Sequence, residues 1–114
     1  MNSQLKIVDL TDTNFNETVL KSSELFLVAI TANWNGASHL IFPIIEKIMQ
    51  KFRGQLKAGN LDFERNSIIP EKFHVCQLPA LLLFKEGQAI NFLSGPVSFK
   101  ILEEVIQKSL ETFD

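Results

Sequence analysis

The feature that most constrains the fold is a continuous apolar run from Leu25 to Ile30, followed by a long segment with helical periodicity. An apolar run without polar alternation is typical of a central strand that is buried on both faces of a sheet. In the segment that follows, apolar residues recur at helical spacing up to Gly54, a plausible helix stop. Pro43 lies inside this helix and should kink it, because proline removes a backbone donor. The recurring residues are Leu40, Ile41, Ile44, Ile45, Ile48, Met49 and Phe52.

The residues before Leu25 predict one more strand and one more helix. Thr11-Asp12-Thr13 offers N-cap residues for that helix, because short oxygen-bearing side chains accept hydrogen bonds from the first free amides. The apolar residues of the strand are Leu5, Ile7 and Val8, and those that share a face of the helix are Phe15, Val19 and Leu20.

The residues after Gly54 continue the alternation of predicted strands and helices. A strand is predicted over 56–62 and a short helix near 67–73. Two further strands, over 80–85 and 89–93, are joined by Glu86-Gly87-Gln88 as a hairpin turn. Ser98 can cap a final helix that would bury Leu102, Val105, Ile106, Leu110 and Phe113. The pattern predicts one α/β domain over residues 1–114, with five strands and four helices.

Composition excludes several classes of function. The 114 residues are 46% hydrophobic and 21% charged, which is typical of a globular chain rather than a disordered one. The net charge of −2 supplies no basic field for nucleic acid or anionic lipid. The first residues lack a targeting pattern and no apolar run approaches the ~20 residues of a membrane span, so we expect a cytoplasmic protein without a membrane partner. Cys76 is the single cysteine and cannot form a disulfide within the chain.

Three segments resemble those of thioredoxin. The first is the apolar strand over 25–31, the second is the helix containing Pro43, and the third runs from Leu78-Pro79-Ala80 to Gly87 and is similar to the family's proline loop and the strand after it. The resemblance covers roughly residues 5 to 110. It implies a thioredoxin fold with a central mixed sheet, and a cis peptide bond between Leu78 and Pro79.

The resemblance also implies that the redox chemistry of the family is absent. Family enzymes carry Trp-Cys-Gly-Pro-Cys where this chain has Trp34, Asn35, Gly36, Ala37 and Ser38. Asn35 thus replaces the cysteine that attacks a disulfide, and Ser38 replaces the one that resolves the mixed disulfide. An amide is not a nucleophile, and a serine hydroxyl without a strong base stays protonated. We therefore expect no dithiol activity.

The residues that support this chemistry in the family are replaced as well. A buried aspartate and a nearby lysine of the family correspond here to Ala29 and Asn60, and a small polar residue after the loop proline corresponds to Ala80. Without cysteines a buried carboxylate would cost desolvation energy with no return, and alanine relieves that cost. The residues that shape the family's site remain, namely Trp34, Gly36, Pro43, Pro79 and Gly95.

Each candidate residue also has a structural interpretation. Asn35 is a good N-cap residue whose side chain could accept from an amide near Ser38, and we favour that role over a catalytic one. Ser38 can simply be a small residue in a first helical turn, and Trp34 can be core filler or part of a binding surface. His39 and His74 lack the spacing of a metal site, so we interpret both as surface or loop histidines and expect no metal or cofactor.

Cys76 lies three residues before Pro79, on the loop that flanks the former active site. It can be a lone unreactive cysteine, since no lysine or arginine is adjacent in sequence. Alternatively it is an exposed thiol that forms a mixed disulfide. The family's single-cysteine members carry theirs at the start of the helix, which position 76 does not match.

Three hypotheses for the function follow. The first, which we favour, is a non-catalytic module that binds an extended segment of a protein partner in the former substrate groove. Its expected binding residues are Trp34, Asn35, Gly36, Ala37, Ser38, Leu78, Pro79 and Gly95, with Ser94 and Pro96 beside them. The second is a redox enzyme or sensor that acts through Cys76. The third is a structural homodimer formed through the same apolar face.

Overall fold

A computed structural model describes residues 6–111 of the chain. Its helices are η2 (Asn16–Leu20), α1 (Gly36–Lys51), α2 (Ile68–Lys72) and α3 (Phe99–Glu111). Its strands are β1 (Ile7–Leu10), β2 (Leu25–Thr31), β3 (Leu56–Asp62), β4 (Ala80–Lys85) and β5 (Gln88–Ser94). The predicted order of strands and helices is confirmed, whereas the predictions for Leu5 and Phe113 lie outside the described residues.

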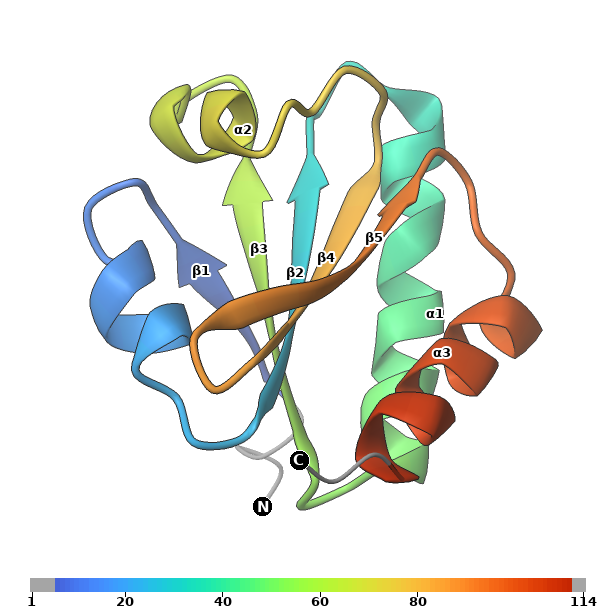
Figure 1. Cartoon of the computed structure of the whole chain (residues 1–114). Coiled ribbons are helices and arrows are strands. Elements are labelled where there is room, and N and C mark those ends of the chain that lie inside the picture. The colour runs from blue at the N-terminus through green and yellow to red at the C-terminus, as the bar shows by residue number, and fades with distance from the viewer. Residues whose placement is uncertain (1–5, 112–114) are drawn as a thin grey trace.

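The five strands form one mixed sheet in the order β1-β3-β2-β4-β5. β1 and β2 run parallel to β3, whereas β4 is antiparallel to β2 and β5 is antiparallel to β4. Figure 1 shows α1 and α3 on one side of this sheet and η2 with α2 on the other. Because β1, β2 and β3 are parallel, their carboxyl ends lie at the same end of the sheet, beside the N-terminus of α1.

Two apolar cores fill the space between the sheet and the helices. One joins β2, β3 and β4 to α1 and α3, with Ile45, Ile48 and Ile106 fully buried. The other joins the opposite sheet face to η2 and α2, with Phe15 and Phe26 inside it. Every residue of β2 is buried, as predicted for a central strand. Leu40 departs from its predicted place in the core, because it is 70% exposed on the outward side of α1.

Two predicted boundaries shift. The helix α1 runs through Pro43 and ends at Lys51, and Gly54 lies in the following turn with a φ of 83°. The hairpin turn consists of Glu86 and Gly87, both with positive φ, and Gln88 already belongs to β5. Such a two-residue turn matches the twist of the strands that it joins.

The helix predicted after Thr11 is reduced to one π-helical turn, and the predicted capping of it by residues 11–13 is wrong, because its N-cap is Phe15 and no side chain caps it. Thr11 Oγ1 accepts from the Asn14 N–H at 3.0 Å while Asn14 Oδ1 accepts from the Thr11 N–H at 2.8 Å. Asp12 instead caps α2, since its two carboxylate oxygens accept from the N–H groups of Ile68 and Ile69 at 3.0 and 2.9 Å. Ser67, at the start of α2, makes no side-chain cap. The cap of α2 therefore comes from a distant loop.

Replacing Asp12 with alanine is expected to lower the free energy of unfolding by about 1 to 2 kcal/mol, because two amides at the start of α2 lose their acceptors. Urea unfolding of the two proteins measures the difference. Asp12→Asn keeps one acceptor oxygen and should lose less. Equal stability of Asp12→Ala and the wild type would show that this cap contributes nothing.

Candidate functional site

The N-terminus of α1 is where a redox enzyme of the family would carry its first cysteine. Asn35 has an extended backbone there, and its Oδ1 accepts a hydrogen bond from the Ser38 N–H at 2.7 Å. This is the N-cap geometry predicted from the sequence. The side chain at position 35 thus satisfies one of the free amides of the helix.

Ser38 is 1% exposed and is also bonded to the backbone. Its Oγ accepts from the Ala32 N–H at 3.2 Å, which ties the first turn of α1 to the end of β2. The side chains at both positions that carry sulfur in the redox enzymes therefore accept hydrogen bonds from backbone amides here.

Beneath this turn lies the pair that replaces the family's charged residues. Ala29 of β2 is fully buried and stands opposite Asn60 of β3. Asn60 Oδ1 accepts from the Thr31 hydroxyl at 2.8 Å. A small polar hollow of about 210 Å³ adjoins Asn60 and Thr31; its lining residues are Asp9, Thr31, Ala32, Asn33, Ser38, His39, Phe42, Asn60 and Asp62.

The two histidines lie at the surface, in line with their interpretation from sequence. His39 is exposed, and its Nε2 is 2.8 Å from the carbonyl oxygen of Asn33. His74 is exposed in the turn after α2 with a φ of 56°. Among residues 6–111, no three His, Cys, Asp or Glu side chains are grouped to hold a metal ion.

The loop that precedes β4 forms the other side of the site. The Leu78–Pro79 peptide bond is cis. The carbonyl oxygen of Pro79 accepts from the Gly95 N–H at 2.8 Å, which extends the pairing of β4 with β5. Gly95 has a φ of 82°, and an added Cβ would lie 2.7 Å from Gln77 Nε2. The positive φ therefore favours a glycine where this loop meets the end of β5, whereas the flexible end of Gln77 could move aside.

An open hollow of about 410 Å³ lies between the Asn35 cap and this loop. Trp34 stands beside it with 63% of its surface exposed, and Phe63 forms part of its wall. No lining residue is acidic or basic. We call this hollow the groove; its lining residues are Trp34, Asn35, Phe63, Val75, Cys76, Gln77 and Leu78.

The groove unites some of the predicted binding residues and omits others. Trp34, Asn35 and Leu78 line it together. Ser38 faces the polar hollow instead, because it lies on the inner side of the first helical turn. The remaining predicted residues do not line the groove, namely Gly36, Ala37, Pro79, Ser94, Gly95 and Pro96.

Phe63 is a groove residue that the sequence analysis missed. It follows directly after β3, and the parallel strands β2 and β3 bring it to the same end of the sheet as Trp34. An aromatic residue immediately after the strand predicted over 56–62 was the available signal.

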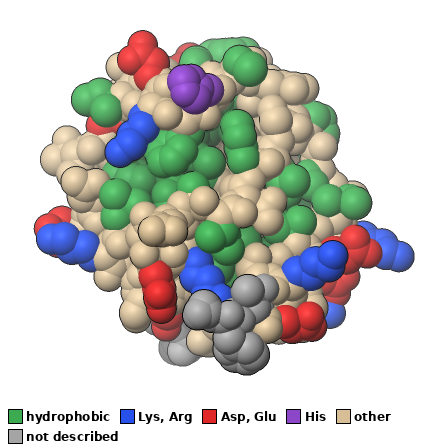
Figure 2. Space-filling view, viewed as in Figure 1, with side chains coloured by type: hydrophobic (Ala, Val, Ile, Leu, Met, Phe, Trp, Pro, Cys, Tyr) green, Lys and Arg blue, Asp and Glu red, His purple; other side chains and the backbone are tan. Residues whose placement is uncertain are grey.

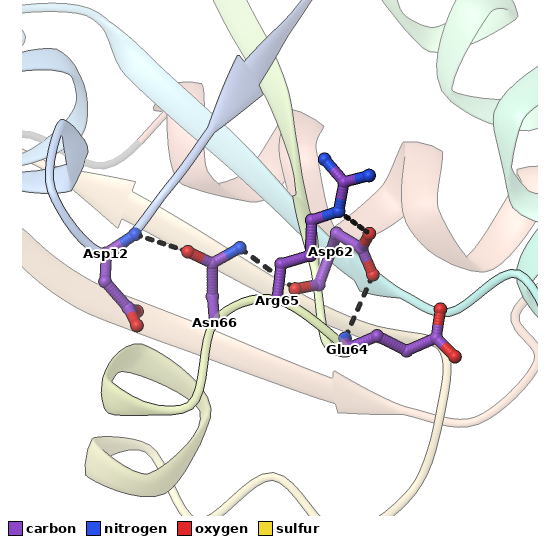
Figure 3. Close-up of polar contacts among 5 residues, drawn as sticks. All are labelled: Asp12, Asp62, Glu64, Arg65 and Asn66. Atoms are coloured by element: carbon purple, nitrogen blue, oxygen red, sulfur yellow. Dashed lines mark hydrogen bonds and ion pairs between the residues drawn. The ribbon is translucent and has the colours of Figure 1, made fainter.

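A network of polar contacts holds the loop that carries Phe63 (Figure 3). Asp62 Oδ1 accepts from the Glu64 N–H at 2.9 Å, and Arg65 Nε lies 3.8 Å from Asp62 Oδ2. Asn66 is buried; its amide donates to the Asp62 carbonyl at 3.0 Å, and its Oδ1 accepts from the Asp12 N–H at 2.8 Å. This wall of the groove is thus fixed to β3 and to the loop after β1.

The groove also contains the single thiol of the chain. Cys76 is exposed and lines the groove with Trp34 and Asn35. Its position agrees with the prediction that it flanks the former active site.

None of the helices between residues 6 and 111 combines the length and the apolar character that a membrane crossing requires.

Comparison with known proteins agrees with this geometry. The thioredoxin family model matches residues 6–108. The thioredoxin of Buchnera aphidicola from Acyrthosiphon pisum is 32% identical over 105 residues, which cover 92% of this chain and 97% of that protein. The thioredoxin of Pseudomonas aeruginosa is 36% identical over 92 residues, or 81% of this chain and 85% of that one. That of Staphylococcus saprophyticus is 32% identical over 106 residues, or 93% of this chain and all of that one. With its fold, its site geometry and these relatives in agreement, the chain belongs to the thioredoxin family.

Proposed function

We propose that this chain is a thioredoxin-like binding module without dithiol activity, and that it holds an extended segment of a protein partner in the groove. One observation carries the proposal. The side chains at both former cysteine positions, Asn35 and Ser38, are bonded to backbone amides, while an exposed tryptophan remains beside an open hollow. Exposed aromatic residues beside a concave surface are typical of binding sites.

The walls of the groove suggest how a segment would bind. Trp34 and Phe63 offer aromatic surface, and Leu78 precedes the loop proline. In the family, the backbone of the residue before this proline pairs with an extended substrate chain, and such strand addition needs no thiol. Main-chain hydrogen bonds would then supply register, and the aromatic side chains would supply most of the binding energy.

We propose a cytoplasmic location. The cytoplasm keeps thiols reduced, and a chain with a single cysteine forms no internal disulfide that would need an oxidising compartment. Nucleic acid and membrane surfaces are not proposed as partners, because the net charge of −2 offers them no attraction.

We expect no turnover above a thiol-free control in an insulin-reduction assay, because the two-thiol cycle needs a nucleophile and a resolving thiol.

The double variant Asn35→Cys with Ser38→Cys should form a disulfide, since residues three apart at a helix start can meet the required distance. It should still reduce insulin more slowly than the Pseudomonas aeruginosa thioredoxin, because Ala29 and Asn60 supply no charge beneath the thiols. Equal rates would show that positions 29 and 60 do not limit the chemistry.

The test of the module itself begins with capture from the source cell, with and without reductant. A synthetic peptide from the captured protein is then titrated into labelled full-length chain, and backbone amide shifts are mapped by NMR. Shifts that saturate around Trp34, Phe63 and Leu78 in the presence of reductant support the proposal. Shifts confined to α3, or capture that requires the absence of reductant, contradict it.

A second function rests on Cys76, because its thiol is exposed and lies within the groove. In that case the partner would be held by a mixed disulfide. Cys76→Ser separates the two functions, since it should leave non-covalent binding unchanged and abolish thiol-dependent capture. Insulin-reducing turnover that disappears in Cys76→Ser would also favour the second function.

A further inference from the structure

The strand β5 forms an open edge of the sheet and lacks the protection that edge strands usually carry. It pairs with β4 on one side, and no strand of residues 6–111 pairs with its other side. Residues 87–99 contain no Asp, Glu, Lys or Arg, although natural edge strands are commonly protected by charges, lysine above all. Its single protective feature is a bulge, where Ile90 is the extra residue between the pairs that Ala89 and Asn91 make with β4.

The surface around this edge is apolar. Ile90 and Phe92 are 41% and 44% exposed. Figure 2 shows apolar side chains gathered toward the middle of the face on which β5 lies in front, with most charged side chains around the rim. Aromatic residues without charges are typical of the centre of an interface.

A hydrogen bond just after β5 shows which way the N–H and C=O groups of this strand point. The Gly95 N–H donates to Pro79, so the polar backbone groups of Gly95 point toward β4. Because these groups alternate along an antiparallel strand, those of Leu93 also point toward β4. The N–H and C=O groups of Phe92 and Ser94 therefore point outward, away from the sheet. Within the described part of the chain no other segment's backbone pairs with these groups, which form an open ladder beside the exposed ring of Phe92.

We infer that β5 is an interface at which two copies of this chain pair edge to edge, in antiparallel orientation, and join their sheets into one. A second copy fits this edge for two reasons. Antiparallel pairing about a two-fold axis brings each strand opposite itself, and an uncharged strand places no like charges together. The pairing also closes, whereas pairing of β5 with β1 of another copy would leave edges open and continue into a fibre. This surface shares no lining residue with the groove, although Ser94 Oγ lies 3.4 Å from Oε1 of Gln77, a groove residue.

Sedimentation equilibrium of the full chain, from low micromolar to millimolar concentration, tests the inference. The apparent mass of the wild type should double across that range. The Phe92→Lys variant should keep the mass of a monomer, because the substitution places two like charges at the shared edge. Ile101→Lys is the matched control, because Ile101 is 47% exposed on α3 and should leave the dimer intact. Trp34→Ala should also leave it intact. Its loss in Trp34→Ala would instead assign the dimer to the groove.

Hydrogen exchange distinguishes main-chain pairing from side-chain contact, because only main-chain pairing gives the outward amides of β5 a hydrogen-bond partner. The outward amides of Phe92 and Ser94 should exchange at least tenfold more slowly at high concentration, whereas that of Leu93, already directed at β4, should not change. A wild-type chain that stays monomeric throughout, or a dimer with unchanged exchange at Phe92 and Ser94, would overturn the inference.

Discussion

Replacing Ala29 with aspartate is expected to lower the free energy of unfolding at neutral pH by about 3 kcal/mol or more, because the carboxylate would be buried without a counter-charge. Ala29 is fully buried in the core beneath α1. Its neighbours on the adjacent strands are Asn60 and Leu81, and neither is charged. Asn60 Oδ1 already accepts from Thr31, which leaves its amide group as the available donor to a carboxylate.

The loss should depend on pH in a defined direction. In acid the introduced carboxyl is protonated in both the folded and the unfolded chain, so the charge penalty is absent. As the pH rises, the unfolded chain releases its proton more readily than the folded one, and the deficit grows. Urea unfolding at acidic and neutral pH measures this change. Ala29→Asn is the matched control of equal size, and its deficit should not vary in this way; equal stability of the two variants at neutral pH would contradict the argument.

Replacing Trp34 with alanine is expected to weaken binding of the captured peptide by about 2 kcal/mol, or roughly 30-fold in Kd. Trp34 presents the largest exposed aromatic surface beside the groove, and a partly exposed ring gains most when a partner covers it. Isothermal titration calorimetry on the wild type and the variant measures the change. The fold should be unaffected, because the ring is mostly outside the core.

Two further variants make the result specific. Phe63→Ala should weaken binding in the same direction, because Phe63 lines the same hollow. Ile101→Ala removes an exposed apolar side chain from α3 and should leave the affinity unchanged. An unchanged Kd in Trp34→Ala would mean that the groove is an inherited shape without a binding role.

Much of the fold could be predicted because its signals are local. The apolar run of β2 and the periodicity of α1 require only neighbouring residues, and both elements appear where the sequence predicts them. The N-cap by Asn35 is equally local, since donor and acceptor lie three residues apart. Leu40 was misplaced because helical spacing alone does not tell how wide the buried face is.

What could not be predicted depends on contacts between distant segments. The carboxylate of Asp12 caps a helix that begins 56 residues later, and no local pattern distinguishes it from Thr11 as a cap residue. Phe63 joins Trp34 only because parallel strands bring their ends together. The division between the groove and the polar hollow likewise depends on which side of the first helical turn Ser38 occupies.

The hydrogen bonds at positions 35 and 38 also bear on how easily two cysteines could be introduced there. Dithiol chemistry would need two substitutions, and a first change to cysteine at either position removes the side-chain oxygen that accepts from a backbone amide, a hydrogen bond worth about 1 kcal/mol. Neither single cysteine completes a dithiol cycle, so the intermediate sequence would lose stability before any dithiol activity could be selected. The bonds that secure the start of α1 therefore oppose a stepwise introduction of the two cysteines.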